Sequence, residues 1–558
     1  MYTDSFIANI ETGIRNNWEL PALSDYKKES ITYREVAERI AQLHIFFKNA
    51  GIERGDKIVL CGRNSSIWAI SFFATITYGA VAVPLLHEFK SEAVTHLVNH
   101  SDGKLLFVGD VVWEGLNADD MPELKAAIQM QNFELVSCND DKIATAFNSI
   151  KENFDKAYPD GFTPQDVVYE RDNLDSLALI NYTSGTTSLS KGVMLSYRAL
   201  LSNYMFACEV LPNLTPGMNV ISMLPSAHMY GLQFEVIFEF LRGIHIHFLT
   251  RIPSPKIVAE AFAAVKPDII ISVPLIIEKI YKSKLKPIAD KMLVKMLLKT
   301  PIIDVVLKDK ILSALTESFG GKFYEIIIGG AALNKEVETF LKKIGFPYTV
   351  GYGMTECGPI ICYEDWNIFK AGSCGKAAPR MTLKIDSPDP QNVPGEILAK
   401  GDNVMLGYYK MPEETAEVKR NGWLHTGDLG YIDEDGYLII TGRKKNLIIL
   451  SNGKNVYPEE IENELSATPG VLEIVVYEGQ SRRGISHNAI VAEIYPDMEY
   501  LEKNGITDVQ AHIKPYVDAY NRSTVPYKKI SVIKIRKKEF PKNTLRKIMR
   551  FKMDMTID

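Results

Sequence analysis

Apolar and polar residues follow two regular patterns along most of this chain. Apolar residues recur with helical spacing between Thr32 and Gly51, which predicts an amphipathic helix that starts after the threonine and stops at the glycine. Uninterrupted apolar runs predict buried strands over residues 56–62, 267–273 and 324–330. Continuously apolar strands that alternate with helices are typical of parallel sheets covered on both faces. The pattern therefore predicts an α/β fold built from layered parallel sheets.

The pattern changes near residue 362. From there to about residue 441 the apolar runs are short and turn residues are dense, as in DSPDPQNVPGEI, which predicts a small β-barrel or antiparallel sheet. Residues 446–558 return to alternating strands and helices. We therefore expect a large N-terminal domain over residues 1–441, with its barrel-like part at about 362–441, and a smaller α+β domain over residues 446–558.

Composition and charge narrow the class of protein. The 558 residues carry a net charge of −6, which argues against a general nucleic-acid-binding protein. The six cysteines are scattered without a C-x-x-C pair, which predicts reduced thiols and argues against a zinc site. No apolar run approaches the roughly 20 residues that span a bilayer, and the N-terminus lacks the pattern of a signal peptide. We therefore expect a cytoplasmic protein that is soluble or at most peripheral to a membrane.

One basic segment is a candidate for contact with a membrane surface. Residues 286–300 predict a helix with Lys291, Lys295 and Lys299 on one stripe and with Met and Leu at most other positions. Such a stripe is most often a solvated face, and alternatively it contacts a membrane surface. No pattern in the sequence indicates an oligomeric state.

Residues 182–192, YTSGTTSLSKG, form the first candidate site. Apolar residues before and after this loop predict that it joins two strands. The five residues between Gly185 and Lys191 exclude a Walker P-loop, which needs a second glycine before the lysine and a helix after it. Consecutive small residues can still direct backbone N–H groups into one concavity that binds phosphate. The side chains that would add donors are those of Thr183, Ser184, Thr186, Thr187 and Lys191. Taken alone, the stretch is equally typical of a polar surface loop.

Polar residues in later segments supply what a nucleotide site needs. Glu356, in GYGMTECGP, becomes a Mg²⁺ ligand if a polyphosphate lies beside it, because Mg²⁺ is held by few carboxylates together with phosphate oxygens. Asp428, in GWLHTGDLG, has a carboxylate that can accept hydrogen bonds from both hydroxyls of a ribose. Arg443 lies at the junction of the two expected domains, and Lys547 lies in a basic C-terminal segment. Glu356 and Asp428 are alternatively ordinary solvated residues of turns.

In their order and separation these segments resemble the motifs of the adenylate-forming (AMP-binding) superfamily, across almost the whole chain. The stretches GGAALN, GYGMTE and GRKKNLIILSNGKNVYPEEIE are most similar to those of long-chain fatty acyl-CoA synthetases. The resemblance implies a ligase that uses ATP, Mg²⁺ and CoA. It would convert a fatty acid into an acyl adenylate with release of pyrophosphate, and then into a CoA thioester with release of AMP. It also implies a hinge at residues 442–445, about which a mobile C-terminal domain rotates between the two steps.

The resemblance assigns nucleotide contacts to individual residues. It places the β- and γ-phosphates of ATP on the 182–192 loop, which includes Gly185, the α-phosphate at Thr355, and Mg²⁺ at Glu356 with Thr183. The other implied contacts are Gly330 and Ala331 along the adenine, Tyr352 stacked on it beside Gly353, and Asp428 and Arg443 at the ribose.

Roles in the transfer to CoA follow from the same resemblance. His228 would lie near the carboxylate and the thioester tunnel, although a histidine in this setting is otherwise a structural residue. Lys547 would bridge the substrate carboxylate and the α-phosphate. Lys445 matches the hinge position, Gly453 the glycine beside the pantetheine arm, and Arg251 a cation for the CoA phosphates.

The sequence departs from the family pattern at three positions. Ser188 and Ser190 stand where the family usually has glycine and proline, and Arg546 stands where it usually has glycine. Because these changes remove neither a charge nor a donor, we expect activity to be retained by a looser loop. Three alternatives stay open: a carrier-protein phosphopantetheine as acceptor, a medium-chain or aryl acid as substrate, and a nucleotide-binding protein without catalysis.

Overall fold

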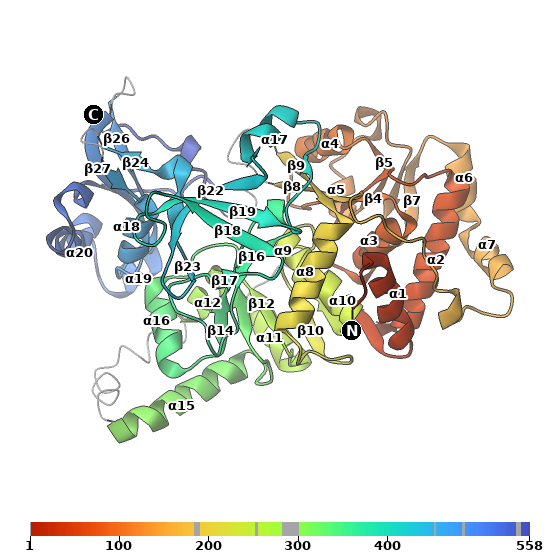
Figure 1. The fold of residues 1–558 in the computed structure, drawn as a ribbon, viewed down its shortest axis with the longest axis horizontal. Helices are drawn as coiled ribbons and strands as arrows, with labels where there is room; N and C mark the ends of the chain where they lie inside the picture. Colours follow the sequence, from red (N-terminus) through yellow and green to blue (C-terminus); the bar gives the residue numbers. More distant parts are fainter. Residues whose placement is uncertain are drawn as a thin grey trace.

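The N-terminal layers and the C-terminal segment lie at opposite ends of the molecule, as Figure 1 shows. The computed structural model describes residues 2–183, 190–251, 255–281, 301–450, 454–481, 486–542 and 548–557. The fold is α/β, as predicted, with several sheets between helices.

An eight-stranded sheet carries the first part of the site. Its strands, in spatial order, are β20 (Gly407–Tyr408), β9 (Lys191–Ser196), β8 (Leu177–Thr183), β4 (Val81–Leu85), β3 (Lys57–Cys61), β5 (Gly103–Val108), β6 (Ala126–Gln129) and β7 (Glu134–Cys138). The central strands β8 to β6 pair in parallel, whereas β7, β9 and β20 are antiparallel to their neighbours. The largely parallel sheet predicted from the sequence therefore has antiparallel edges.

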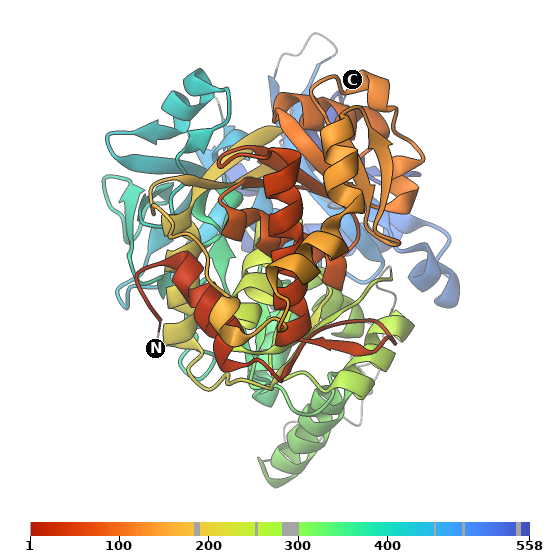
Figure 2. The same cartoon turned by 90° about the vertical axis from the view of Figure 1, so that its right-hand side faces the viewer.

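Local signals account for the helices that cover this sheet. Helix α2 (Tyr33–Ala50) begins with a capping box, in which Thr32 accepts a hydrogen bond from the Glu35 N–H and the Glu35 carboxylate accepts one in return. The helix ends at Gly51, whose φ of 77° favours glycine. The helix predicted between Thr32 and Gly51 is thus confirmed. The other helices before β8 are α1 (Phe6–Asn16), α3 (Ser66–Tyr78), α4 (Ser91–His100), α5 (Asp110–Trp113), α6 (Asp141–Asn148) and α7 (Ile150–Ala157). Figure 2 shows these N-terminal helices from their own side.

Two further sheets with parallel pairs lie below it. One has the order β10 (Asn219–Ser222), β11 (His245–Phe248), β1 (Pro21–Asp25), β2 (Ser30–Thr32), and the other β12 (Ile270–Ser272), β13 (Ile326–Ile328), β14 (Tyr348–Val350). The strands predicted over 56–62, 267–273 and 324–330 are confirmed as β3, β12 and β13. The helices between these strands are α8 (Tyr197–Val210), α9 (Met229–Gly231), the π-helix η3 (Leu232–Ile237), α10 (Phe238–Arg242), α11 (Pro255–Val265), α12 (Pro274–Ile280), α15 (Pro301–Ser318) and α16 (Lys335–Ile344). Helix α15 projects from the body of the molecule in both ribbon views (Figures 1 and 2).

Antiparallel strands connect these layers to the C-terminal segment. A three-stranded sheet has the order β15 (Tyr352–Gly353), β16 (Ile360–Tyr363), β17 (Lys376–Ala377). A five-stranded sheet contains β18 (Met381–Asp386), β19 (Gly395–Gly401), β22 (Trp423–Ile432) and β21 (Lys419–Arg420), with β23 (Leu438–Arg443) also paired to β22. Helix α17 (Pro412–Val418) precedes β21.

The chain after β23 forms its own small sheets and core. They are β24 (Ile448–Ile449) with β25 (Asn455–Val456), and β26 (Val471–Gln480), β27 (Ser486–Pro496) and β28 (Ile530–Ile535) in that order. Its helices are α18 (Pro458–Leu465), α19 (Met498–Lys503) and α20 (Val509–Ser523). Across the described residues, no helix combines the length and the apolar character that crossing a bilayer requires. The basic segment 286–300 lies outside the described residues.

Candidate active site

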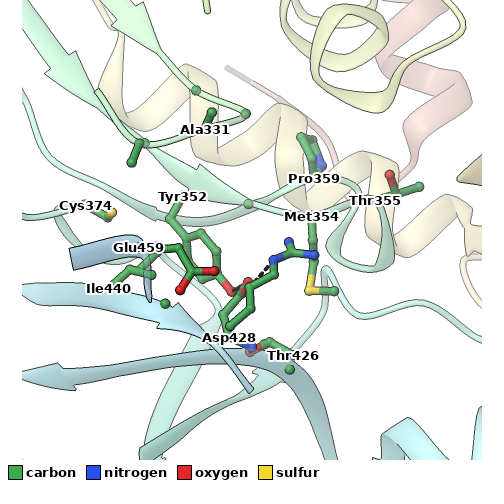
Figure 3. A pocket seen from close by; sticks show the side chains of 18 of the residues that line it. Ala331, Tyr352, Met354, Thr355, Pro359, Cys374, Thr426, Asp428, Ile440 and Glu459 are labelled. Atoms are coloured by element: carbon green, nitrogen blue, oxygen red, sulfur yellow. Dashed lines mark hydrogen bonds and ion pairs between the residues drawn. The ribbon is translucent and has the colours of Figure 1, made fainter. Parts of the chain in front are cut away.

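One large cavity collects most of the residues singled out from the sequence. Its volume is about 1840 Å³. Its lining includes residues of almost every sheet, among them Thr183, Lys191, His228, Gly330, Ala331, Tyr352, Gly353, Thr355, Glu356, Asp428, Arg443 and Lys445. Residues far apart in the sequence therefore share one space, part of which Figure 3 shows.

The hairpin of β8 and β9 brings a hydroxyl and a cation to this cavity. Thr183 and Lys191 are partners in the antiparallel ladder, and they form its last pair before the loop that connects the two strands. Two strands flank the loop, as the sequence predicts, and Ser196 at the end of β9 is the N-cap of α8. Residues 184–189, which contain Ser184, Gly185, Thr186, Thr187 and Ser188, lie outside the described residues.

Tyr408 contacts both charged groups at this end of the cavity. Strand β20 pairs with the outer edge of β9, which places the Tyr408 ring centroid 4.7 Å from Nζ of Lys191. The Tyr408 hydroxyl donates a hydrogen bond of 2.8 Å to Oε1 of Glu356. Burial raises the pKa of the Glu356 carboxyl, and the Tyr408 hydrogen bond acts in the opposite direction because it stabilises the ionised form. Tyr408 thus contacts the Lys191 ammonium with its ring and the Glu356 carboxylate with its hydroxyl.

A tight turn of the backbone positions Glu356. After β15 the Met354 N–H donates to the Pro359 carbonyl at 2.9 Å, and Thr355–Cys357 forms one 3₁₀ turn between them. A Cβ atom at Gly353 would lie 2.3 Å from that same carbonyl oxygen, so only glycine fits there. The close approach of the two strands therefore depends on this glycine.

Asp428 forms the centre of a second polar cluster. Its Oδ2 accepts a hydrogen bond of 2.6 Å from the Tyr352 hydroxyl, and its Oδ1 lies 2.9 Å from Nε of Arg443 (Figure 3). Asp428 is 5% exposed, whereas the Arg443 side chain is 57% exposed. Burial, with the nearby Asp428 charge, raises the pKa of Tyr352 well above its usual value, so the hydroxyl stays a donor. The cluster presents a fixed carboxylate and a guanidinium that solvent reaches.

His228 lines the same cavity as a group of apolar residues. The side-chain amide of Asn181, on β8, donates a hydrogen bond of 2.8 Å to the Ala227 carbonyl and so fixes the turn before His228. His228 is the N-cap of α9, and its Nδ1 accepts from the Tyr230 N–H at 3.3 Å. The lining that contains His228 also contains the apolar side chains of Phe206, Phe234, Phe238, Ile271 and Ile327. This group of five residues is called the apolar branch below.

Glycine and alanine form the opposite wall. Gly330 follows β13 with a φ of 87°, a conformation that side-chain-bearing residues rarely adopt. Ala331 comes next and lines the cavity (Figure 3). Gly330 and Ala331 therefore bring no polar side chain to the cavity.

Three other predicted residues lie elsewhere or are not described. Arg251 lies outside the cavity lining, and its guanidinium lies 5.5 Å from the centroid of the Tyr26 ring. Gly453 and Lys547 lie outside the described residues. Ile548, directly after Lys547, lines the cavity and pairs with Lys542 in an isolated bridge.

Two residues of the site escaped the sequence analysis. Nothing in the run GYYK distinguishes Tyr408, which contacts Glu356, from its neighbour Tyr409. Glu459 of α18 also lines the cavity and reaches toward Tyr352 in Figure 3. Its Oε1 accepts a hydrogen bond of 2.6 Å from the side-chain amide of Asn446. Its Oε2 is buried without a hydrogen-bond partner in the described part of the chain. The motif NVYPEEIE contains this residue but gives no sign of where its side chain points.

Comparisons with known proteins show which family and which fold the chain resembles. Residues 11–409 match the sequence model of the family described as AMP-binding enzyme. The chain is 31% identical to long-chain-fatty-acid–CoA ligase 5 of Rattus norvegicus, over 84% of this chain and 71% of that protein. It is 27% identical to the long-chain-fatty-acid–CoA ligase of Escherichia coli O6:H1, over 94% of this chain and 89% of that protein.

A solved structure shows the same fold. The crystal structure of ATP-bound MatB from Rhodopseudomonas palustris is similar with a TM-score of 0.77 and 24% identity, over 98% of this chain and 97% of that chain. At this level of identity the likeness concerns the fold alone.

Proposed function

We propose that this chain, which belongs to the AMP-binding enzyme family, activates a long-chain fatty acid with ATP and transfers the acyl group to CoA. It is an AMP-forming acid–CoA ligase that uses ATP, Mg²⁺ and CoA. The observation that supports a fatty acid is the apolar branch, which opens into the same cavity as Lys191, Glu356 and Asp428. The relatives named above, both long-chain-fatty-acid–CoA ligases, support the chain length.

The nucleotide would lie between the two polar clusters. In this arrangement Asp428 and Arg443 contact the ribose, because a carboxylate accepts from both hydroxyls while the arginine holds it in place. The adenine would lie along Gly330 and Ala331, with Tyr352 stacked on it. The phosphates would then reach the end of the β8–β9 hairpin, where Lys191 supplies a cation and the loop it closes supplies donors.

Glu356 and Thr183 would hold Mg²⁺. Both offer oxygen atoms, which are the ligands Mg²⁺ takes, and one carboxylate suffices where phosphate oxygens complete the set. When bound, the ion would offset phosphate charge during the reaction.

The chemistry proceeds in two displacements. In the first, a carboxylate oxygen of the acid attacks the α-phosphorus of ATP, the bond to the β-phosphate oxygen breaks, and pyrophosphate leaves. Because two anions approach each other, Lys191 and Lys547 are needed to neutralise charge, and Thr355 contacts the α-phosphate. In the second, the CoA sulfur attacks the acyl carbon, loses its proton, and displaces AMP. His228, at the start of the apolar branch, would lie beside that carbon.

Between the two displacements the C-terminal part would turn about Lys445. The proposed units are residues 1–441 and 446–558, joined at 442–445. Rotation would remove Lys547 and bring Gly453 to the pantetheine arm, while Arg251 contacts the CoA phosphates from outside the cavity.

A substrate series tests the proposal. Purified protein is given ATP, Mg²⁺ and saturated acids from medium to long chain, or an aryl acid, with and without CoA. Pyrophosphate, AMP and acyl-CoA are then measured. We expect acyl-CoA only when CoA is present, with the highest kcat/KM for the long-chain acids. An acyl adenylate that CoA does not convert would contradict the assigned acceptor. A preference for medium-chain or aryl acids would contradict the chain length, and absence of pyrophosphate exchange with every acid would contradict activation itself.

A further inference from the structure

Two glutamates lie buried in the wall beside the apolar branch. They belong to the continuous helical stretch of η3 and α10 that follows His228, and both Glu235 and Glu239 are 0% exposed. A buried carboxyl group is strongly unfavourable unless it has hydrogen-bond partners. Each of the two therefore needs a structural or a functional reason.

Glu235 has a structural reason. Its Oε2 accepts hydrogen bonds from the Met223 N–H at 3.1 Å and the Leu224 N–H at 2.9 Å, and from the Ser222 hydroxyl at 3.3 Å. These bonds fix the segment that leads to His228. The burial of Glu235 is thus explained by the backbone it holds.

Glu239 has no such reason. Neither of its carboxyl oxygens has a hydrogen-bond partner in the described part of the chain. Unlike Glu235, however, Glu239 is one of the residues that line the cavity, as are Phe238 on its own helix, Val210 at the end of α8 and Leu211, the C-cap of α8. A fully buried residue whose carboxyl oxygens have no partner in the described part of the chain is therefore one of the residues of the cavity lining, as are those of the apolar branch.

The protonation state of Glu239 limits what it can bind. Burial raises the pKa of its carboxyl well above the usual value, and the nearby Glu235 acts in the same direction. The group is then neutral, with one O–H donor and one carbonyl acceptor. An ammonium or a second carboxylate in the tail would bring a charge among phenylalanine rings, which is costly. A hydroxyl both donates and accepts and carries no charge.

We propose that Glu239 recognises a hydroxyl group on the tail of the acid, so that hydroxylated fatty acids are the preferred substrates. This inference rests on the proposed acid–CoA ligase activity and names its substrate class. A plain hydrocarbon tail leaves the Glu239 carboxyl group without a hydrogen-bond partner, as in the free protein. A hydroxyl on the tail would form hydrogen bonds with that group. Sites that hydrogen-bond a substrate hydroxyl discriminate against analogues that lack it.

Matched pairs of acids test the proposal in the wild-type protein. Each pair has the same chain length, with and without one hydroxyl, and the hydroxyl is placed at successive carbons of the distal half. We expect kcat/KM for the hydroxylated acid to exceed that for its partner by about ten- to a hundredfold at one or two adjacent positions, the range of a single satisfied hydrogen bond. No preference at any position overturns the proposal.

Variants assign the preference to Glu239. Glu239→Leu should abolish it, whereas Glu239→Gln, whose amide also donates and accepts, should keep most of it. Gln233→Leu is the matched control, because Gln233 is also 0% exposed with both amide atoms unpartnered in the described chain, but lies outside the cavity lining. Its preference should equal that of the wild type.

The outcomes separate this inference from the proposed function. If Glu239→Leu retains the preference, or Gln233→Leu loses it as well, the assignment to Glu239 is wrong. If Glu239→Leu does not fold, the wild-type series and Glu239→Gln still decide. Thioesters formed from plain acids without any preference would overturn the inference alone. No thioester from any acid would overturn the proposed function.

Discussion

Tyr408 contacts both Lys191 and Glu356 at the end of the cavity where the phosphates are proposed to bind, so removing its hydroxyl tests the electrostatics of the site. The hydroxyl donates to Glu356 at 2.8 Å, and the ring lies 4.7 Å from the Lys191 ammonium. Burial raises the pKa of Glu356, and the hydrogen bond from Tyr408 opposes that rise. Tyr408→Phe keeps the ring under Lys191 and removes only the hydrogen bond. The pKa of Glu356 should therefore rise further.

The size of the shift follows from the energy of that bond. A hydrogen bond to a charged group contributes roughly 1.5–3 kcal/mol, and about 1.4 kcal/mol corresponds to one pKa unit. Taking the lower value, because water replaces part of the bond in a cavity open to solvent, we expect a rise of about one unit. Glu356 must be ionised to hold Mg²⁺, so the acidic limb of the rate profile moves to higher pH by about the same amount.

Pyrophosphate exchange measured from acidic to neutral pH gives this limb directly. Tyr409→Phe is the control, because the Tyr409 hydroxyl donates to Asp102 at 2.7 Å and not to Glu356. It makes the same chemical change one residue along and should leave the limb in place. Tyr408→Leu removes the ring as well and should further raise the KM for ATP, since Lys191 loses an interaction of about 0.5–1 kcal/mol. A limb that Tyr408→Phe does not move would refute the role of Glu356 as the titrating ligand.

Three other predictions concern separate parts of the molecule. Lys547→Ala should abolish acyl-adenylate formation but leave thioester formation from supplied acyl-AMP intact; equal loss in both assays would contradict its role. Gly353→Ala should lower the melting temperature and activity, because its Cβ would lie 2.3 Å from the Pro359 carbonyl, whereas Gly351→Ala, with its nearest contact at 3.5 Å, should be tolerated. Burial lowers the pKa of His245 to about 4. Because unfolding lets it take up a proton, stability should fall from about pH 6.5 toward pH 4, by about 3 kcal/mol in total. His245→Gln should show a smaller fall in melting temperature between neutral and acidic pH.

Elements with strong local signals could be predicted from the sequence. Thr32, Glu35 and Gly51 bound α2 because capping and a left-handed stop act within a few residues. The buried strands β12 and β13 follow from continuous apolar runs. The antiparallel edges of the eight-stranded sheet could not be predicted, because β20 has only two residues and its position depends on pairing with β9, more than two hundred residues earlier.

The same distinction holds for the site. Thr183 and Lys191 flank one loop whose sequence, taken alone, fits a phosphate contact and a polar surface loop equally well; the motifs elsewhere in the chain favour the phosphate contact. Tyr408 and Glu239 could not be recognised, because their meaning depends on which groups lie beside them. Tyr408 draws attention because it contacts Glu356, and Glu239 because its carboxyl group has no partner in the described chain.

The pairing of β22 with β23 fixes Asp428 and Arg443, the proposed ribose contacts, to the sheet. Asp428 and Arg443 are direct partners in this ladder, and Arg443 is the last residue of β23. The next residue, Lys444, is held to β19 through its 2.8 Å contact with Glu396. Arg443 and Lys444, the two residues of the proposed hinge segment directly before Lys445, are therefore both tied to the five-stranded sheet.

From Lys445 onward the chain leaves this sheet. The cavity therefore has contacts that belong to the sheet and contacts that belong to the segment after Lys445. A rotation about Lys445 would leave Asp428 and Arg443 in place, since the ladder that joins them ends before it. The same rotation would carry away the wall formed by Glu459 and Ile548, because both follow Lys445 in the chain. The nucleotide would then stay bound by its sugar while the groups around the reacting carbon change. That is the condition under which one cavity can perform an adenylation and a thioester transfer in turn without releasing the intermediate.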